Sequence, residues 1–177
     1  MTTGTLYATK NARGMLPRGL IEWISIPMKP VNLKNGAKLE KSLYGSTLQE
    51  RSQVIRFLSF TNHEIASNAF AVITAAKTNA SQEDYEDKVI KCIACIALLE
   101  QQLSQHDFLI SDQITIAGLY AASLFGTLLA LVLGKDKMDG FCLLGKWLPK
   151  VLQHPALKNR VDTSSFLERT IAPSAAK

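Results

Sequence analysis

The longest uncharged stretch of this chain, Ile114 to Leu133, constrains its fold more than any other feature of the sequence. Its 20 residues are long enough for a helix that spans a bilayer. A helix that is apolar on all sides can equally form the centre of a helical domain. The stretch also contains polar and small residues, namely Thr115, Gly118, Tyr120, Ser123, Gly126 and Thr127. We therefore predict a buried central helix, and a membrane-associated helix is the weaker alternative.

Charge is distributed unevenly along the 177 residues. The formal net charge is +5, and the excess lies in residues 1–41, which carry seven basic and two acidic side chains. Such a segment is either a solvated basic surface or a surface that meets an anionic ligand. The chain contains no nucleic-acid-binding motif, so neither nucleic acid nor a membrane is expected as a partner.

The location of the protein is predicted from its cysteines and its first residues. Three cysteines, an odd number, favour a reducing compartment over a disulfide framework. Residues 1–4 lack the charged and apolar regions of a secretory signal. A cytoplasmic location is therefore expected.

The pattern of apolar residues changes near Gly45. Before it, short strands are predicted at residues 5–8 and 30–36, with a helix at 15–24 between them, as in a small α/β unit. After it, helical periodicity dominates, and short loops indicate antiparallel packing in a bundle. The helices are expected at residues 48–76, 84–105, 115–133 and 141–153, with a short element near 163–169.

Local signals refine these helices. The polar step Thr61-Asn62 is expected to bend the first long helix, whose apolar stripe includes Val54 and Ile55. Ser81 and Thr115 are suitable N-caps, and Gly134 is a suitable C-terminal stop. In the second long helix we expect the inward residues to be Tyr85, Val89, Ile93, Ile96, Leu99 and Leu103.

Three segments together resemble a known family. They are residues 4–8 with 17–20, residues 53–57, and residues 108–119 followed by Trp147 and the His-Pro turn at 154–158. In this order they resemble glutathione transferases, in particular the transferase-like domain of the elongation factor one-B gamma subunit and its fungal relatives. The resemblance implies an α+β protein: a truncated thioredoxin-like segment at residues 1–45, an all-helical C-terminal domain at 46–172, and a tail at 173–177.

The resemblance also implies glutathione as co-substrate and names candidate site residues. Tyr7 would activate the thiol of glutathione, because Gly14 stands where the family often has a hydroxyl or thiol donor. Arg13 would pair with a carboxylate of glutathione. Ser42 matches a residue that holds the γ-glutamyl end, beside Lys41 in place of an acidic residue. The alternatives are a packed aromatic at Tyr7 and a solvated side chain at Arg13.

Departures from the family pattern are as informative as the matches. The Val-Pro dipeptide that normally holds the backbone of glutathione is missing, which indicates an internally shortened N-terminal segment. In the uncharged helix Gly118 replaces an aspartate, so the helix cap rests on Thr115 alone. Replacement of Gly118 by Asp is therefore expected to preserve the fold.

Two other pairs of residues have side chains that are often reactive or ligand-binding. Cys92 and Cys95 have redox C-x-x-C spacing, but they lie in the middle of a predicted helix and have no second pair for zinc. We therefore expect buried structural thiols and no metal. Asn62 and His63 lie on the first long helix, where they either contact a substrate or form an ordinary surface pair.

The resemblance implies a glutathione S-transferase-like protein. It would act on a small electrophile in secondary-metabolite biosynthesis, with the thiolate of glutathione as nucleophile. The alternative is a non-catalytic interaction module similar to elongation factor one-B gamma. A homodimer is compatible with either reading.

Overall fold

The computed structural model describes residues 41–78 and 80–171, and this part of the chain is helical. The predicted helical domain is confirmed. The α/β unit predicted for residues 1–40 and the tail lie outside the described residues. The elements in chain order are η2 (Lys41–Tyr44), α2 (Leu48–Phe60), the π-helical turn η3 (Thr61–Ile65), α3 (Ala66–Lys77), α4 (Gln82–Leu103), α5 (Ile116–Leu131), η4 (Lys135–Lys137), α6 (Cys142–Leu152) and η5 (Thr163–Ser165).

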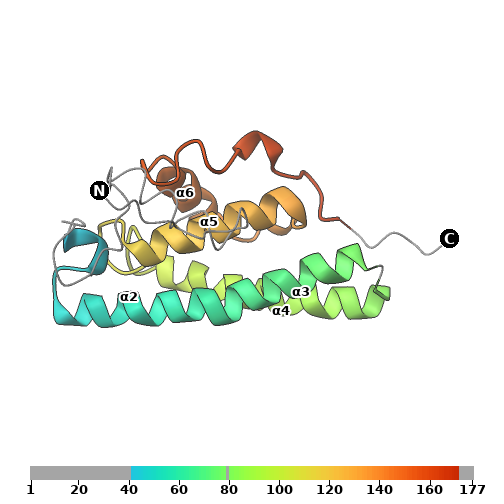
Figure 1. Cartoon of the computed structure of the whole chain (residues 1–177), viewed down its shortest axis with the longest axis horizontal. Helices are drawn as coiled ribbons and strands as arrows, with labels where there is room; N and C mark the ends of the chain where they lie inside the picture. The colour runs from blue at the N-terminus through green and yellow to red at the C-terminus, as the bar shows by residue number, and fades with distance from the viewer. Residues whose placement is uncertain (1–40, 79, 172–177) are drawn as a thin grey trace, which may run out of the picture.

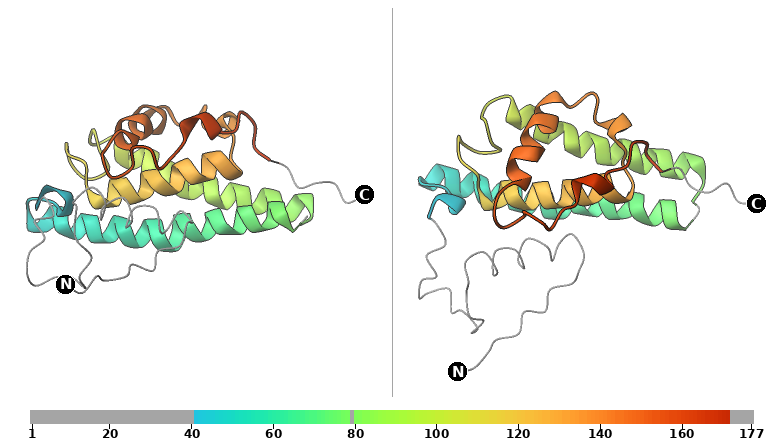
Figure 2. Two further views of the ribbon diagram at one scale, coloured as in Figure 1. Left: turned by 45° about the horizontal axis from the view of Figure 1, so that its top comes forward. Right: turned by 90° about the horizontal axis from the view of Figure 1, so that it is seen from above.

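The helices form layers around α5. Helices α2 and α3, joined through η3, make one long rod, and α4 returns beside α3 (Figure 1). Helix α5 packs on α2 from one side and contacts α6 from the other. The C-terminal segment then lies along α5 (Figure 2).

The rod begins with a complete capping box. The amide of Glu50 donates to Thr47 Oγ1, and the Glu50 carboxylate accepts from the Thr47 amide, both at 3.1 Å. The bend predicted at Thr61-Asn62 is a π-helical turn, in which the Ala66 amide donates to the carbonyl of Thr61. The prediction that Ile55 faces the core was wrong. Val54 and Phe57 set the buried face, and Ile55 is 68% exposed.

Helix α4 presents a regular apolar face to the core. Ser81 caps it by accepting from the Asp84 amide, as predicted. Ile93 is half-buried and packs against the core, as predicted, whereas the fully buried Cys92 beside it was not among the predicted inward residues. When Cys92 is included, the sequence spacing between buried residues alternates between four and three, which keeps these residues on one face of the helix. They are Tyr85, Val89, Cys92, Ile96, Leu99 and Leu103.

Helix α5 is the buried central helix that the uncharged stretch predicts. Eleven of its 16 residues are buried. The Gly118 amide donates to Thr115 Oγ1 at 3.4 Å, so Thr115 caps the helix as expected. No helix within residues 41–78 and 80–171 combines the length and apolar character needed to cross a membrane.

The helix ends at Leu131, before Gly134, which has another role. Residues 166–171, which we call the C-terminal strap, pass directly against Gly134. A Cβ atom at this position would overlap the backbone of Arg169 and Thr170. The strap is held by backbone hydrogen bonds from Leu167 N to Leu129 O and from Ile171 N to Val132 O, both 2.9 Å. Glycine is therefore required where the strap docks.

The N-terminus of α6 is capped by a residue from another helix. Its N-cap residue, Phe141, makes no side-chain cap. Instead the Glu100 carboxylate of α4 accepts from the amides of Leu143 and Leu144, one oxygen each, at 2.8 Å. This contact satisfies two amides that the helix itself leaves unpaired, and it places negative charge at the positive end of the helix dipole.

We predict that Glu100→Ala destabilises the domain by about 1–3 kcal/mol, because two amides lose a charged acceptor. The measurement is urea unfolding followed by far-ultraviolet circular dichroism. Gln101→Ala is the matched control, since the neighbouring Gln101 is exposed. Equal stability of the two variants would show that the Glu100 cap contributes nothing.

Gly118 offers a second test. A Cβ atom there would lie 3.8 Å from Trp147 Cζ2 and 3.9 Å from Thr115 Oγ1, which are ordinary contacts. Gly118→Ala is expected to stabilise the domain by up to about 1 kcal/mol through helix propensity. Gly118→Asp should stabilise it by a few tenths to about 1 kcal/mol, because its carboxylate can complete the capping box and favours the helix dipole.

The reference for both Gly118 variants is Gly145→Ala, because no atom lies within 4 Å of a Cβ built on this helical glycine. Thermal melting gives the comparison. Clear destabilisation by both Gly118 variants, with Gly145→Ala stabilising, would contradict the placement of α5 against α6.

Candidate functional site

The structure describes only part of the predicted glutathione site. Tyr7 and Arg13 lie outside the described residues, so their predicted roles remain predictions. Ser42 lies in η2, where its backbone alone is described. The described part of the candidate site is therefore the helical wall formed by α2, η3 and α5.

The π-helical turn shapes this wall. It places Thr61 and Ile65 in the core, both fully buried, and Asn62 half-buried beside α5. The Tyr120 hydroxyl of α5 donates to Asn62 Oδ1 at 3.1 Å. Thr61 Oγ1 has no hydrogen-bond partner among the described residues. Such turns are frequent at functional sites, because the extra residue redirects side chains that a regular helix would place elsewhere.

Asn62 and His63 do not act as a pair. The His63 ring is exposed, with its Nδ1 atom 3.0 Å from the Ser59 carbonyl one turn earlier in the same rod. Asn62 instead meets Tyr120 from another helix. Of the two predicted alternatives, the geometry supports a surface role for His63 and a wall position for Asn62.

Tyr120 was not among the predicted site residues. It stands out in the sequence as the single tyrosine of the uncharged stretch, and that was the available signal. Further along α5, the hydroxyls of Ser123 and Thr127 donate to the carbonyls of Tyr120 and Ser123 at 2.9 Å. Because these hydroxyls are satisfied within the helix, α5 contributes a largely apolar surface to its neighbours.

Of the two cysteines predicted to be buried, Cys92 is buried and Cys95 is half-buried. Burial, with a smaller contribution from Cys95, raises the pKa of the Cys92 thiol to about 12. Burial and the nearby Glu64 carboxylate raise the pKa of Cys95, although a hydrogen bond from Asn68 opposes this shift. Both thiols therefore stay protonated at neutral pH, and the thiolate is the reactive form. Within the described ranges no three His, Cys, Asp or Glu side chains are grouped so that they could hold a metal ion.

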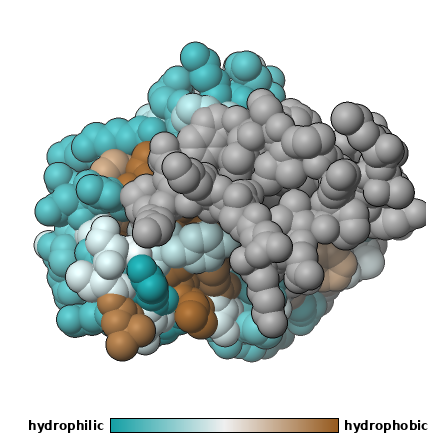
Figure 3. Space-filling model, turned by 60° about the vertical axis from the view of Figure 1, so that its left-hand side comes forward, coloured by the Kyte–Doolittle hydropathy of each residue, from teal (hydrophilic) through white to brown (hydrophobic). Residues whose placement is uncertain are grey.

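Apolar surface is exposed at the end of the molecule where the described chain begins. Tyr44 is 41% exposed and Leu48 is 84% exposed. Figure 3 shows hydrophobic side chains gathered on this face. An apolar surface next to the start of α2 is suited to contact with another part of the chain or with a partner.

Comparisons with known proteins identify the family. The model of the glutathione S-transferase C-terminal domain matches residues 53–155, more than half of the chain. The chain therefore belongs to the family of proteins that contain this domain.

Two curated proteins are similar to this chain in sequence. A glutathione S-transferase of Emericella nidulans is 25% identical over 72% of this chain and 48% of its own length. An elongation factor 1-gamma of Saccharomyces cerevisiae is 22% identical over 98% of this chain and 52% of its own length. The chain thus spans about half the length of these curated relatives.

The fold matches that of the transferase-like domain of elongation factor 1-gamma from Saccharomyces cerevisiae. The crystal structure of that domain superposes with a TM-score of 0.84 at 20% sequence identity, over 99% of this chain and all of the other. This likeness defines a glutathione-transferase-like fold with a helical C-terminal domain.

Proposed function

We propose that this chain is a glutathione S-transferase-like protein that presents a small electrophile to the thiol of glutathione. In this role the helical domain supplies the apolar wall of the substrate site, and residues 1–45 supply the glutathione contacts. The observation that carries the proposal is the family match over residues 53–155, which cover α2 to α6 apart from the first turns of α2. We propose a secondary-metabolite pathway and a cytoplasmic location as the setting.

The wall around Asn62 and Tyr120 supports this role. Helix α5 offers an apolar surface whose hydroxyls are internally bonded, and the π-helical turn places one amide side chain beside it. A mostly apolar surface with a few fixed polar groups is the usual lining of a small-molecule site. The hydrogen bond from the Tyr120 hydroxyl to Asn62 fixes the orientation of both polar side chains on this wall.

The glutathione contacts are proposed at Tyr7, Arg13 and Ser42, on a shortened thioredoxin-like segment. The alignment with one elongation factor 1-gamma runs over 223 positions, whereas this chain has 177 residues. Part of that relative therefore has no counterpart here. Tyr7 would donate to the sulfur of glutathione and so favour the thiolate.

The second candidate function is a non-catalytic interaction module. One observation favours it: the elongation factor 1-gamma relative covers 98% of this chain, whereas the transferase relative covers 72%. Two replacements point the same way: Gly14 stands where the family often has a hydroxyl or thiol donor, and Lys41 stands in place of an acidic residue. In this role the domain would bind a protein partner and no substrate.

We also propose a homodimer, which fits either function. Ile55, Phe70 and Leu98 expose 68%, 69% and 51% of their surfaces on the layer formed by α2, α3 and α4. A second copy that covers this layer would remove these three side chains from water. Sedimentation as a monomer at micromolar concentration would contradict this proposal.

The enzyme and the module give different results with glutathione. For the enzyme we expect retention of the chain on immobilised glutathione and turnover of a generic aromatic halide. Tyr7→Phe should lower kcat/KM by about a hundredfold, because the sulfur loses its hydroxyl donor. Tyr44→Phe is the matched control, since Tyr44 is not among the proposed contacts, and it should leave turnover unchanged.

The contrary results are equally clear. Neither retention nor turnover at millimolar glutathione would contradict the enzyme and favour the interaction module. Turnover that is equally reduced in the Tyr7 and Tyr44 variants would contradict the role of Tyr7 while leaving the enzyme in place.

A further inference from the structure

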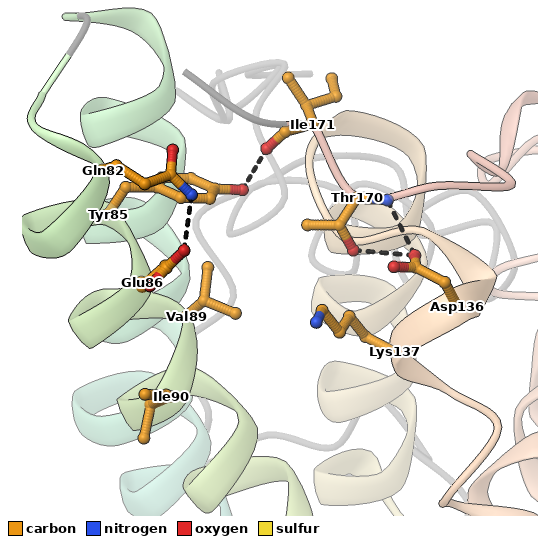
Figure 4. A pocket seen from close by; sticks show the side chains of 9 residues that line it. All are labelled: Gln82, Tyr85, Glu86, Val89, Ile90, Asp136, Lys137, Thr170 and Ile171. Atoms are coloured by element: carbon orange, nitrogen blue, oxygen red, sulfur yellow. Dashed lines mark hydrogen bonds between the residues drawn. The ribbon is translucent and has the colours of Figure 1, made fainter.

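A groove lies beside the N-terminal half of α4, between this helix and the C-terminal strap. Its volume is about 390 Å³, within the range of small-molecule sites. One wall is the first half of α4, and the other is formed by η4 and the end of the strap (Figure 4). Nine residues line it: Gln82, Tyr85, Glu86, Val89, Ile90, Asp136, Lys137, Thr170 and Ile171.

One hydrogen bond joins the two walls, and two more hold the η4 and strap wall together. The Tyr85 hydroxyl donates to the Ile171 carbonyl. Burial and the Asp136 carboxylate raise the pKa of Tyr85, so its hydroxyl remains a donor at neutral pH. Asp136 Oδ1 accepts from the amide and the hydroxyl of Thr170, at 2.8 and 2.9 Å. The strap is therefore a fixed wall of the groove.

Two opposite charges on facing walls stay without an ionic partner. The three ion pairs among the described residues join Asp84 to Lys88, Asp87 to Lys91 and Lys135 to Glu168. Glu86 and Lys137 belong to none of them, and both are exposed. Figure 4 shows the Lys137 ammonium reaching from its wall toward α4, while Gln82 holds Glu86 through a 2.7 Å hydrogen bond. Glu86 and Lys137 do not form an ion pair with each other, so the groove between them has a carboxylate on one wall and an ammonium on the other.

The surface between these charges is apolar. Val89 is buried in the α4 wall, and Ile90 and Ile171 are 66% and 41% exposed. Apolar groups placed there would cover these side chains from water, which is favourable in proportion to the area removed. The groove thus combines an apolar surface with a carboxylate on one side and an ammonium on the other.

We propose that this groove binds a short zwitterionic peptide with apolar side chains. The ammonium of the peptide pairs with Glu86, its carboxylate pairs with Lys137, and its side chains contact Val89, Ile90 and Ile171. In a dipeptide the two charges are separated by a peptide unit, which suits charged groups on opposite walls of the groove. The site is separate from the wall at Asn62 and Tyr120, so it does not depend on the proposed transferase activity.

The test is a titration of the full chain with the dipeptide Leu-Leu, followed by NMR of isotope-labelled isoleucine methyl groups. We expect saturable shifts at Ile90 and Ile171 with a millimolar or lower Kd. N-acetyl-Leu-Leu, which lacks the ammonium, and Leu-Leu amide, which lacks the carboxylate, should each bind about three- to tenfold more weakly.

Variants then assign each charge to its partner. Glu86→Gln should remove the preference for a free ammonium, and Lys137→Gln should remove the preference for a free carboxylate. The double variant Glu86→Lys with Lys137→Glu exchanges the two charges. It should bind Leu-Leu as the original chain does, with the peptide in the opposite direction. The matched controls, Glu83→Gln and Lys158→Gln, change exposed residues outside the groove lining and should leave both preferences intact.

Several results would overturn the proposal. These are no saturation at millimolar Leu-Leu, shifts that gather away from Ile90 and Ile171, and preferences unchanged by the groove variants. Equal binding of N-acetyl-Leu-Leu amide would also overturn it, and would indicate an apolar surface for a protein segment. Thermal melting of each variant separates loss of binding from loss of the fold.

Discussion

The burial of α5 is the constraint on which the rest of this domain depends. The helix has no charged residue, and 11 of its 16 residues are buried, so it is stable only while other elements cover it. Each fully buried leucine side chain, such as Leu119 or Leu128, contributes about 1.5–3 kcal/mol relative to exposure. The rod of α2 and α3, the return helix α4, and α6 with Trp147 are arranged around it, and the C-terminal strap closes its end.

The outer elements are fixed by a small number of polar contacts. The Glu100 carboxylate links α4 to the start of α6, and the backbone of the strap bonds to the end of α5. The π-helical turn brings Asn62 against Tyr120 and so joins the rod to the central helix. Both candidate sites follow from these attachments, because the apolar wall is a face of α5 and the groove exists only where the strap meets α4.

The helical part of the fold was predictable because it rests on periodicity and caps. The uncharged stretch, Thr115 and Ser81 gave the position of the helices within two or three residues. The prediction was wrong at Ile55 and missed the burial of Cys92, because neighbouring residues on a helix point about 100° apart. The Glu100 cap, the strap against Gly134 and the groove could not be predicted, because each joins residues far apart in sequence. The predicted glutathione contacts rest on the family resemblance alone.

Because the other elements cover α5, it should be the most stable element of the domain, and native-state hydrogen exchange tests this most directly. The amides of α5 from Leu119 to Leu129 should exchange only through global unfolding, with protection equal to the full free energy of unfolding. The strap and η5 have no buried side chain, so they should open at lower free energy. Exchange of the α5 amides that is faster than that of α4, or through local openings, would contradict the central position assigned to this helix.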